Sequence, residues 1–566
     1  MKRKLLNSIS TLILLGFSTV IFFSCNQTQT EKMENELKAF IKNFEGEIIP
    51  LQKEANLAYF NASITGKEED YKKSEELNIK ITKLFANKEN FAKLRKIKES
   101  NAVKDEILKR ELIVIYNSFA GNQGDEKKLE EIVKIETNIE KKFSTYRAKV
   151  GGKEITDNDV ENILKNSTNS DELKEAWMAH KKIGPTVAED IKKLVKLRNE
   201  IAKEAGFNNY HEMSLSSNEE NPKEIEKLFD ELDELTKNEF KKQKDIVDNF
   251  LSKKDKVKKE ELMPWHYQNR YFQAAPRIYK VDLDSIYKNE DIVALAEKFY
   301  AGIDLPIDDM VKKSDLFEKP GKNQHAYCTN IDKKGDIRVV CNIKPNVEWM
   351  SIMLHEFGHA DYDKYIDKNL PYVLQDPACI FTTEAIAMFF GRLSVNAQWI
   401  QDMIGIKDEE KNKIADEVFK SLKLEQLVFS RWAQVMYRFE KSMYENPDQD
   451  LNKLWWNLVE KYQMIKCPEG RNEPDWATKI HIATVPCYYH NYLMGELLAS
   501  QLYNYIKVNV LKSIEKNISF VGKKEVGDYL KQKVFTPGLK YYWNDMIEKA
   551  TGEKLTAKYY AKQFVN

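Results

Sequence analysis

The sequence predicts a predominantly helical protein with one small antiparallel β element, and three observations support this fold class. From residue 31 to about residue 250, Lys, Glu, Leu and Ile recur at helical spacing with few Gly or Pro, a pattern typical of amphipathic helices. Strand-like patterns are confined chiefly to residues 327–331 and 337–343, on either side of the turn-forming residues 332–335. The length of 566 residues is more than one compact core usually takes, so we expect two lobes.

Composition excludes one class of partner. The chain has 89 Lys and Arg against 89 Asp and Glu, so it carries no bulk positive charge to draw it onto DNA or RNA. We therefore expect no nucleic-acid partner.

The first 25 residues have the pattern of an export signal. Lys2, Arg3 and Lys4 precede an apolar run that ends at Ser24 and Cys25, and the run is too short to predict a permanent membrane span. A small residue before the first cysteine resembles a bacterial lipoprotein cleavage site. This implies removal of residues 1–24 and a lipid on Cys25, which would anchor an exported protein in the bacterial cell envelope, periplasmic or surface-facing. The alternative is an ordinary signal peptide that is cut slightly later.

The residues after Cys25 are polar, and residues 25–35 are predicted to form a tether. Five cysteines remain beyond Cys25, so in an oxidising compartment at least one thiol stays free. Cys328 and Cys341 flank the predicted turn, and we expect that a cross-strand disulfide can join them.

His355, Glu356 and His359 form the motif that decides the function. Two imidazoles four residues apart lie on one face of a helix, where they can bind a single Zn²⁺. An accidental match has odds of roughly 1 in 100, and the apolar residues around the motif favour a helix that enters a core. A structural zinc site would have four protein ligands, whereas this pattern leaves one position for water.

Glu384 is the predicted third ligand, 25 residues after His359, with Pro371 and Pro377 breaking the chain between them. We expect Thr382 or Thr383 to cap a new helix and Glu384 to lie in its first turn. The alternative is that Glu384 binds no metal, because an acidic residue in a first turn also stabilises the helix through its interaction with the helix dipole. The three residues together predict one Zn²⁺ per chain.

Residues 479–492 contain a lysine, two histidines and three tyrosines within fourteen positions. Peptide hydrolysis needs hydrogen-bond donors for the oxyanion of the tetrahedral intermediate, and this segment offers them. The alternative is that residues 479–492 have no catalytic role and form a buried aromatic cluster beside one surface lysine.

The metal motif, Glu384 and residues 479–492 together resemble the angiotensin-converting-enzyme family of zinc peptidyl-dipeptidases. The resemblance continues through residues 461–463, 467–468 and 471–475, and it weakens before residue 190. It implies a two-lobed ellipsoid with a deep central cleft that holds the zinc. Residues 36–566 would form this peptidase domain.

The resemblance also implies roles for individual residues. His355, His359 and Glu384 would bind zinc; Glu356 would polarise the water; His481 and Tyr492 would stabilise the oxyanion; Lys479 and Tyr489 would hold the substrate carboxylate; and His325 and Ala326 would pair with the peptide backbone. The assignment of Tyr492 assumes that this chain has one residue more than the family between His481 and the tyrosine pair. His490 is the alternative to Tyr492 if that assumption fails.

Three positions depart from the family pattern. Met388 stands where an aspartate usually follows the third ligand, so the hydrogen bond that orients a ligand must come from elsewhere. Asn491 replaces the chloride-coordinating arginine of the animal enzymes. In the family, a glutamine contacts the substrate carboxylate; in this sequence Gln268 is only a candidate for that residue.

The predicted function is hydrolysis of oligopeptides near their C-terminus, with release of dipeptides. One alternative is an endo-acting zinc oligopeptidase of related helical fold. Another is an inactive lipoprotein that only binds peptides. The oligomeric state is left open.

Overall fold

The structure is a computed structural model that describes residues 2–279, 281–323, 325–515 and 517–565, with side chains from residue 29 onward except Ser144. The predicted fold class is confirmed, because helices dominate and the strands form two small antiparallel pairs. The two-lobed shape with a central cleft stays a prediction. Cys25 and residues 1–24 lie outside the residues whose side chains are described, so the predicted signal and lipidation stay predictions.

The helices of the first 302 residues are α1 (Lys2–Thr65), α2 (Glu68–Phe85), α3 (Lys88–Glu99), α4 (Glu106–Ala120), α5 (Glu126–Thr145), α6 (Asp157–Asn166), α7 (Ser170–Lys181), α8 (Ile183–Glu204), α9 (Tyr210–Ser217), α10 (Pro222–Asp255), α11 (Asp284–Tyr287) and α12 (Ile292–Gly302). The remaining helices are α13 (Asp308–Val311), α14 (Val347–Tyr365), α15 (Ile380–Gly391), α16 (Ala397–Ile404), α17 (Asp408–Glu445), α18 (Leu451–Leu458), α19 (His481–Thr484), α20 (His490–Tyr505), α21 (Lys524–Leu530), α22 (Trp543–Thr551) and α23 (Lys558–Phe564). The strands are β1 (Ala148–Val150), β2 (Lys153–Ile155), β3 (Tyr327–Asn330) and β4 (Ile337–Val340).

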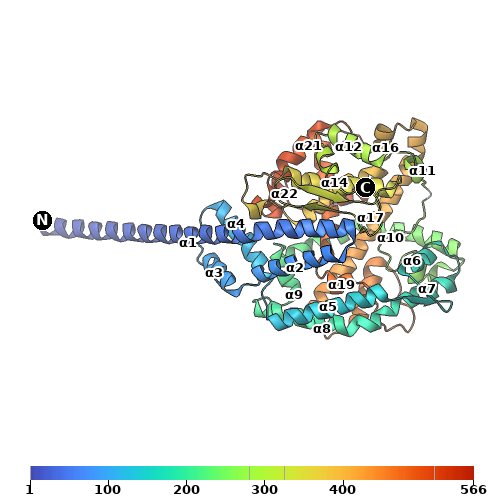
Figure 1. Cartoon of the computed structure of the whole chain (residues 1–566), viewed down its shortest axis with the longest axis horizontal. Helices are drawn as coiled ribbons and strands as arrows, with labels where there is room; N and C mark the ends of the chain where they lie inside the picture. The colour runs from blue at the N-terminus through green and yellow to red at the C-terminus, as the bar shows by residue number, and fades with distance from the viewer. Residues whose placement is uncertain (1, 280, 324, 516, 566) are drawn as a thin grey trace.

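Helix α1 is the long blue helix that begins outside the body of the molecule and then runs along it (Figure 1). Its buried side chains from Met33 to Ile48 share a small apolar core with those of α3 and α4. Farther along, Asn56 donates a hydrogen bond of 3.0 Å to the carbonyl of Asn330, and the rings of Tyr59 and Tyr327 lie 5.4 Å apart. The first helix therefore supports strand β3. From residue 29 onward, no helix is long and apolar enough to cross a membrane.

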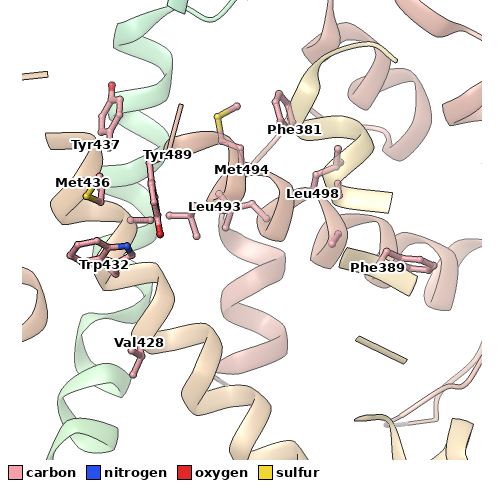
Figure 2. Close-up of a cluster of buried hydrophobic side chains, with 14 of the residues drawn as sticks. Phe381, Phe389, Val428, Trp432, Met436, Tyr437, Tyr489, Leu493, Met494 and Leu498 are labelled. Atoms are coloured by element: carbon pink, nitrogen blue, oxygen red, sulfur yellow. The ribbon is translucent and has the colours of Figure 1, made fainter. Parts of the chain in front are cut away.

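The main core surrounds α14, α15, α17 and α20. Figure 2 shows Phe381 and Phe389 of α15, Trp432 and Met436 of α17, and Leu493 and Leu498 of α20 within one apolar cluster. Burial of these large side chains removes apolar surface from water, which is the main force that holds the four helices together.

Two glycines allow these helices to approach closely. A methyl group on Gly358 of α14 would lie 3.1 Å from the Cα atom of Ala387 in α15. A methyl group on Gly495 of α20 would lie 3.2 Å from the sulfur of Met388 and 3.3 Å from the Cβ atom of Glu384. Because both positions lack a side chain, α14 and α20 pack against the two sides of α15, and residues predicted to act together come close.

Strands β3 and β4 occupy the predicted region and pair antiparallel, with Cys328 opposite Val339. The expected disulfide is wrong: Cys328 and Cys341 are both free thiols. The register explains this, because the partner of Cys328 lies two residues before Cys341, and such diagonal neighbours lie too far apart for a disulfide. Strands β1 and β2 were not predicted. They form a short hairpin around Gly151 and Gly152, which have φ of +56° and +75°, as a two-residue hairpin turn requires.

Candidate active site

The structure brings the three predicted metal ligands together. His355 and His359 come from α14, and their Nε2 atoms lie 3.7 and 3.9 Å from Glu384 Oε2 of α15. One ligand atom from each residue lies within 4.8 Å of the others. Zinc bonds of about 2.0 to 2.1 Å in a tetrahedron place neighbouring donors roughly 3.3 Å apart, so a small inward movement of these side chains suffices. Two imidazoles and one carboxylate are a donor set that suits Zn²⁺ with a position left open.

Burial tunes the protonation of these ligands. It lowers the pKa of His355 to about 4, and burial together with His355 lowers that of His359 to about 3. Both imidazoles are therefore neutral at pH 7, which is the form that binds metal. Burial raises the pKa of Glu384 to about 7. A bound cation would lower this value, because it favours the charged carboxylate.

Thr383 orients one of the ligands. His359 Nδ1 lies 2.7 Å from Thr383 Oγ1 and shares a hydrogen bond with it, which leaves Nε2 directed at the metal-binding group. Thr383 thus gives His359 an orienting hydrogen bond, which the side chain of Met388 is not suited to supply.

The predicted cap of α15 is wrong in detail. The helix begins at Ile380, and Cys379 occupies the N-cap position. The Thr382 hydroxyl accepts a hydrogen bond from the Cys379 N–H at 3.1 Å. Glu384 therefore lies in the second turn, where the helix dipole has little effect, and the purely stabilising reading of this residue loses its basis.

Glu356, the predicted base, is 8% exposed and lies on α14 between the two histidines. Burial and the Glu384 carboxylate raise its pKa to about 8, while the backbone N–H of Cys328 donates to it and lowers the pKa. A carboxyl group with a pKa near neutrality can both accept and return a proton.

The predicted oxyanion donors form a chain of aromatic contacts. The rings of His481 and Tyr489 lie 5.4 Å apart, as do those of Tyr489 and Tyr492. Burial and then Glu384 raise the pKa of Tyr492, so this phenol lies near the metal-binding group. The ring of Tyr488 lies 5.2 Å from that of Tyr492, and its pKa is raised first by burial and then by Glu384.

His481 and His490 have different surroundings. Burial and Lys479 lower the pKa of His481 to about 4, and its buried Nδ1 has no hydrogen-bond partner among the described residues. His490 Nε2, in contrast, lies 2.6 Å from Glu220 Oε2 in a pair that is almost completely buried. His490, the alternative to Tyr492, is therefore already engaged in a buried contact with Glu220.

Lys479 is buried among Gln273, Tyr271, Trp432 and Tyr489, a cluster called the lysine corner below, and the sequence predicted only part of it. Its ammonium group donates a 2.7 Å hydrogen bond to Gln273 Oε1. It also lies 5.2 to 5.5 Å from the ring centres of Tyr271, Trp432 and Tyr489. Burial and Arg270 lower the pKa of Lys479 to about 7. A buried amine with neutral partners is suited to an anionic ligand.

Gln273 is the site residue that the sequence analysis missed. It follows a loop segment held by Gln463, which donates to the carbonyls of Tyr271 and Phe272 at 3.0 and 2.9 Å. The expected candidate Gln268 instead accepts a hydrogen bond from the Arg277 N–H at 2.9 Å. No local pattern marks Gln273, since its partner lies 206 positions away.

His325 and Ala326, which the resemblance assigned to the substrate-binding strand, lie immediately before β3 and outside it. His325 is exposed, and its N–H donates to Asn323 Oδ1 at 3.0 Å. Ala326 packs against the main core. They lie three and two residues, respectively, before Cys328, whose backbone N–H donates a hydrogen bond to Glu356.

The helical fold and the two-histidine, one-glutamate group define a class of helical proteins with an HExxH metal site. The family model described as angiotensin-converting enzyme matches residues 31–564. The chain therefore belongs to the angiotensin-converting enzyme family, as its motifs indicated.

Known relatives are similar at low identity. The chain is 26% identical over 254 residues to the angiotensin-converting enzyme-like protein Ace3 of Mus musculus, covering 42% of this chain and 33% of that protein. It is 23% identical over 376 residues to the angiotensin-converting enzyme of Mesocricetus auratus, covering 61% and 28%. It is 21% identical over 310 residues to the angiotensin-converting enzyme of Theromyzon tessulatum, covering 53% of this chain and 47% of that protein. The chain thus spans between about a quarter and a half of these relatives.

Proposed function

We propose that this protein is a zinc metallopeptidase that hydrolyses oligopeptides near their C-terminus and releases dipeptides. One observation carries the proposal: a metal-binding group and a buried lysine corner are joined by the ring contact between Tyr489 and Tyr492. The first can support hydrolysis, and the second can hold a terminal carboxylate. Their joint presence favours cleavage at a fixed distance from the peptide end.

His355, His359 and Glu384 would hold the metal. The chemistry that zinc supplies when bound is Lewis acidity, which polarises the scissile carbonyl and acidifies water. Glu356 accepts the proton of the attacking water and later returns it to the leaving amine. His481 and Tyr492 donate hydrogen bonds where negative charge develops on the carbonyl oxygen.

Substrate position depends on two other groups of residues. Lys479, Gln273 and Tyr489 hold the terminal carboxylate through charge and hydrogen bonds in a corner of low dielectric. The backbone at His325 and Ala326 pairs with the extended peptide. Fixing both the end and the backbone of the peptide orients the bond to be cut.

Product analysis separates this proposal from its rivals. Purified, zinc-loaded protein is incubated with matched peptides that end in a free carboxylate or an amide, and fragments are identified by mass spectrometry. Release of C-terminal dipeptides from the free-carboxylate peptide alone supports the proposal. Internal cuts that ignore amidation would establish the endo-acting alternative. No chelator-sensitive cleavage of any peptide would leave only the peptide-binding alternative.

We also propose, from the sequence alone, that Cys25 is lipidated and anchors the exported protein in a bacterial envelope. The apolar run and the small residue before Cys25 support this. Mass spectrometry of the N-terminal peptide from membranes tests it. An unmodified Cys25 within a longer N-terminus would overturn it.

A further inference from the structure

Glu220 is a buried carboxylate that the proposed mechanism does not use. It lies in the connection between α9 and α10, and both Glu220 and its partner His490 are only 1% exposed. Its Oε2 atom lies 2.6 Å from His490 Nε2, and since a carboxylate accepts hydrogen bonds, the imidazole is the donor. Because a buried carboxylate is costly without such a partner, the positions of the two side chains are fixed together.

Glu220 contacts the first residues of two helices. His490 is the first residue of α20, and Cys379, the N-cap residue of α15, has its Sγ atom 3.9 Å from Glu220 Oε1. The N-terminus of a helix carries partial positive charge, which a carboxylate stabilises. One buried carboxylate therefore joins the starting points of α15 and α20.

The same two helices carry two residues of the proposed mechanism. Glu384 lies on α15, five residues after Cys379. Tyr492 lies on α20, two residues after His490. The helices pack closely here, because a methyl group on Gly495 of α20 would lie 3.3 Å from the Cβ atom of Glu384. A displacement of the start of α20 would therefore change where the Tyr492 hydroxyl lies relative to the metal-binding group.

The backbone just before Glu220 is strained. Glu219 has a φ of +59°, in the left-handed region that residues other than glycine rarely adopt. Its carboxylate forms a two-point ion pair with Arg110 of α4, and its carbonyl accepts a hydrogen bond of 3.0 Å from Trp543 Nε1. Such a conformation persists where surrounding contacts enforce it, and it is common at functional sites. The turn therefore fixes the direction in which the Glu220 side chain leaves the backbone.

The contacts that hold this turn come from distant parts of the chain. Arg110 is 8% exposed and also donates a hydrogen bond of 2.7 Å to the carbonyl of Leu539. The N–H of Glu220 donates to the carbonyl of Leu215 at 2.8 Å. A short connection between two helices closes without such contacts, so they indicate that the position of Glu220 itself matters.

We propose that Glu220 is a positioning residue for the peptidase reaction, an inference that rests on the proposed function. Through His490 it fixes the start of α20, so that the Tyr492 hydroxyl points to where the oxyanion forms. The thiol of Cys379 is a weak donor, so the main effect of Glu220 is on Tyr492 and not on zinc binding. Glu220 acts only through these residues and touches neither metal nor substrate.

A double-mutant cycle with Tyr492→Phe tests this role on the full-length, zinc-loaded protein. Glu220→Ala should lower kcat for a free-carboxylate peptide by about 10- to 100-fold, as small misplacements of reacting groups do. KM and zinc content should stay as in wild type, because the loss falls on the transition state. In the Tyr492→Phe background the same substitution should lower kcat by less than about twofold, since the hydroxyl that Glu220 positions is already absent.

Three further variants complete the design. Glu220→Gln keeps an acceptor for His490 and should retain kcat within about threefold of wild type. Glu220→Asp keeps the charge but withdraws the carboxylate by one methylene, so it should lower kcat in the same way as alanine, and it replaces Glu220→Ala in the cycle if the alanine variant does not fold. The matched control is Glu224→Gln, an exposed carboxylate in the first turn of α10, which should behave as wild type.

Equal kcat losses in the two backgrounds would show a general structural effect and overturn the inference. Wild-type kcat in both Glu220→Ala and Glu220→Asp would overturn it as well, as would a raised KM with unchanged kcat. Each of these results leaves the proposed function intact. A wild-type protein without chelator-sensitive cleavage would instead overturn the proposed function, and this inference with it.

Discussion

The metal-binding group and the lysine corner are built in opposite ways. The metal group comes from two consecutive helices, α14 and α15, which contact each other at Gly358. The lysine corner joins Lys479 to Gln273, 206 positions earlier, and to a ring of α17. Local spacing thus determines the metal group, whereas long-range packing determines the corner.

The comparison separates chemistry from specificity. Because the metal group is proposed to carry the hydrolytic chemistry, changes there should affect turnover with any peptide. Because the lysine corner is proposed to bind the terminal carboxylate, changes there should affect only peptides with a free terminal carboxylate. Each prediction below tests one side of this division, from the largest expected effect to the smallest.

Glu356→Gln should lower kcat by about 10³-fold, within the range that general base catalysis contributes. Zinc content should not change, because the three ligands remain. Steady-state kinetics and metal analysis measure the two quantities. The control is Glu348→Gln in the exposed first turn of the same helix, which should behave as wild type. A Glu356→Gln enzyme with wild-type turnover would show that this carboxylate is not the base.

Lys479→Met should lower kcat/KM for free-carboxylate peptides by about 100-fold, since losing one partner of a buried charged contact costs roughly 3 kcal/mol. Cleavage of amidated peptides should stay the same. The matched control is Lys461→Met, an exposed lysine near the corner in sequence. Equal losses for both kinds of peptide would assign Lys479 to turnover rather than specificity.

Thr383→Val should weaken zinc binding by about 10- to 100-fold, the usual loss when a hydrogen bond that orients a metal ligand is removed. Thr383→Ser keeps the hydroxyl and should bind zinc like wild type. Competition with a fluorescent chelator measures both affinities. Unchanged affinity in Thr383→Val would mean that the 2.7 Å contact with His359 does not orient the ligand.

The KM for free-carboxylate peptides should rise about tenfold between pH 6.5 and pH 8. The pKa of Lys479 is lowered to about 7 in the folded protein, so its amine is charged below that pH and neutral above it. A carboxylate binds only the charged form, and each pH unit above the pKa lowers that fraction about tenfold. Amidated peptides provide the control, and a parallel rise in their KM would exclude Lys479 as the titrating group.

The sequence predicted the fold class and the metal group because both depend on local periodicity. His355, His359 and Glu384 lie on helices whose existence the apolar pattern indicates. Gln273 was missed because it lies in an irregular loop, whose position depends on hydrogen bonds from Gln463. Thr383 was considered only as a helix cap, since its distance to His359 depends on how two helices pack.

The errors have the same origin. The disulfide between Cys328 and Cys341 failed because a turn predicts a hairpin but not its register. The β1 and β2 hairpin was overlooked because three-residue strands leave almost no alternating pattern.

One peptide unit links substrate recognition to proton transfer. The N–H of Cys328 holds the Glu356 carboxylate, and the chain just before it, at His325 and Ala326, is the segment assigned to the substrate. A peptide that shifts this strand on docking would also shift the base. Under the proposed function, substrate affinity and turnover are then coupled, because any ligand that displaces this strand also displaces the Glu356 carboxylate.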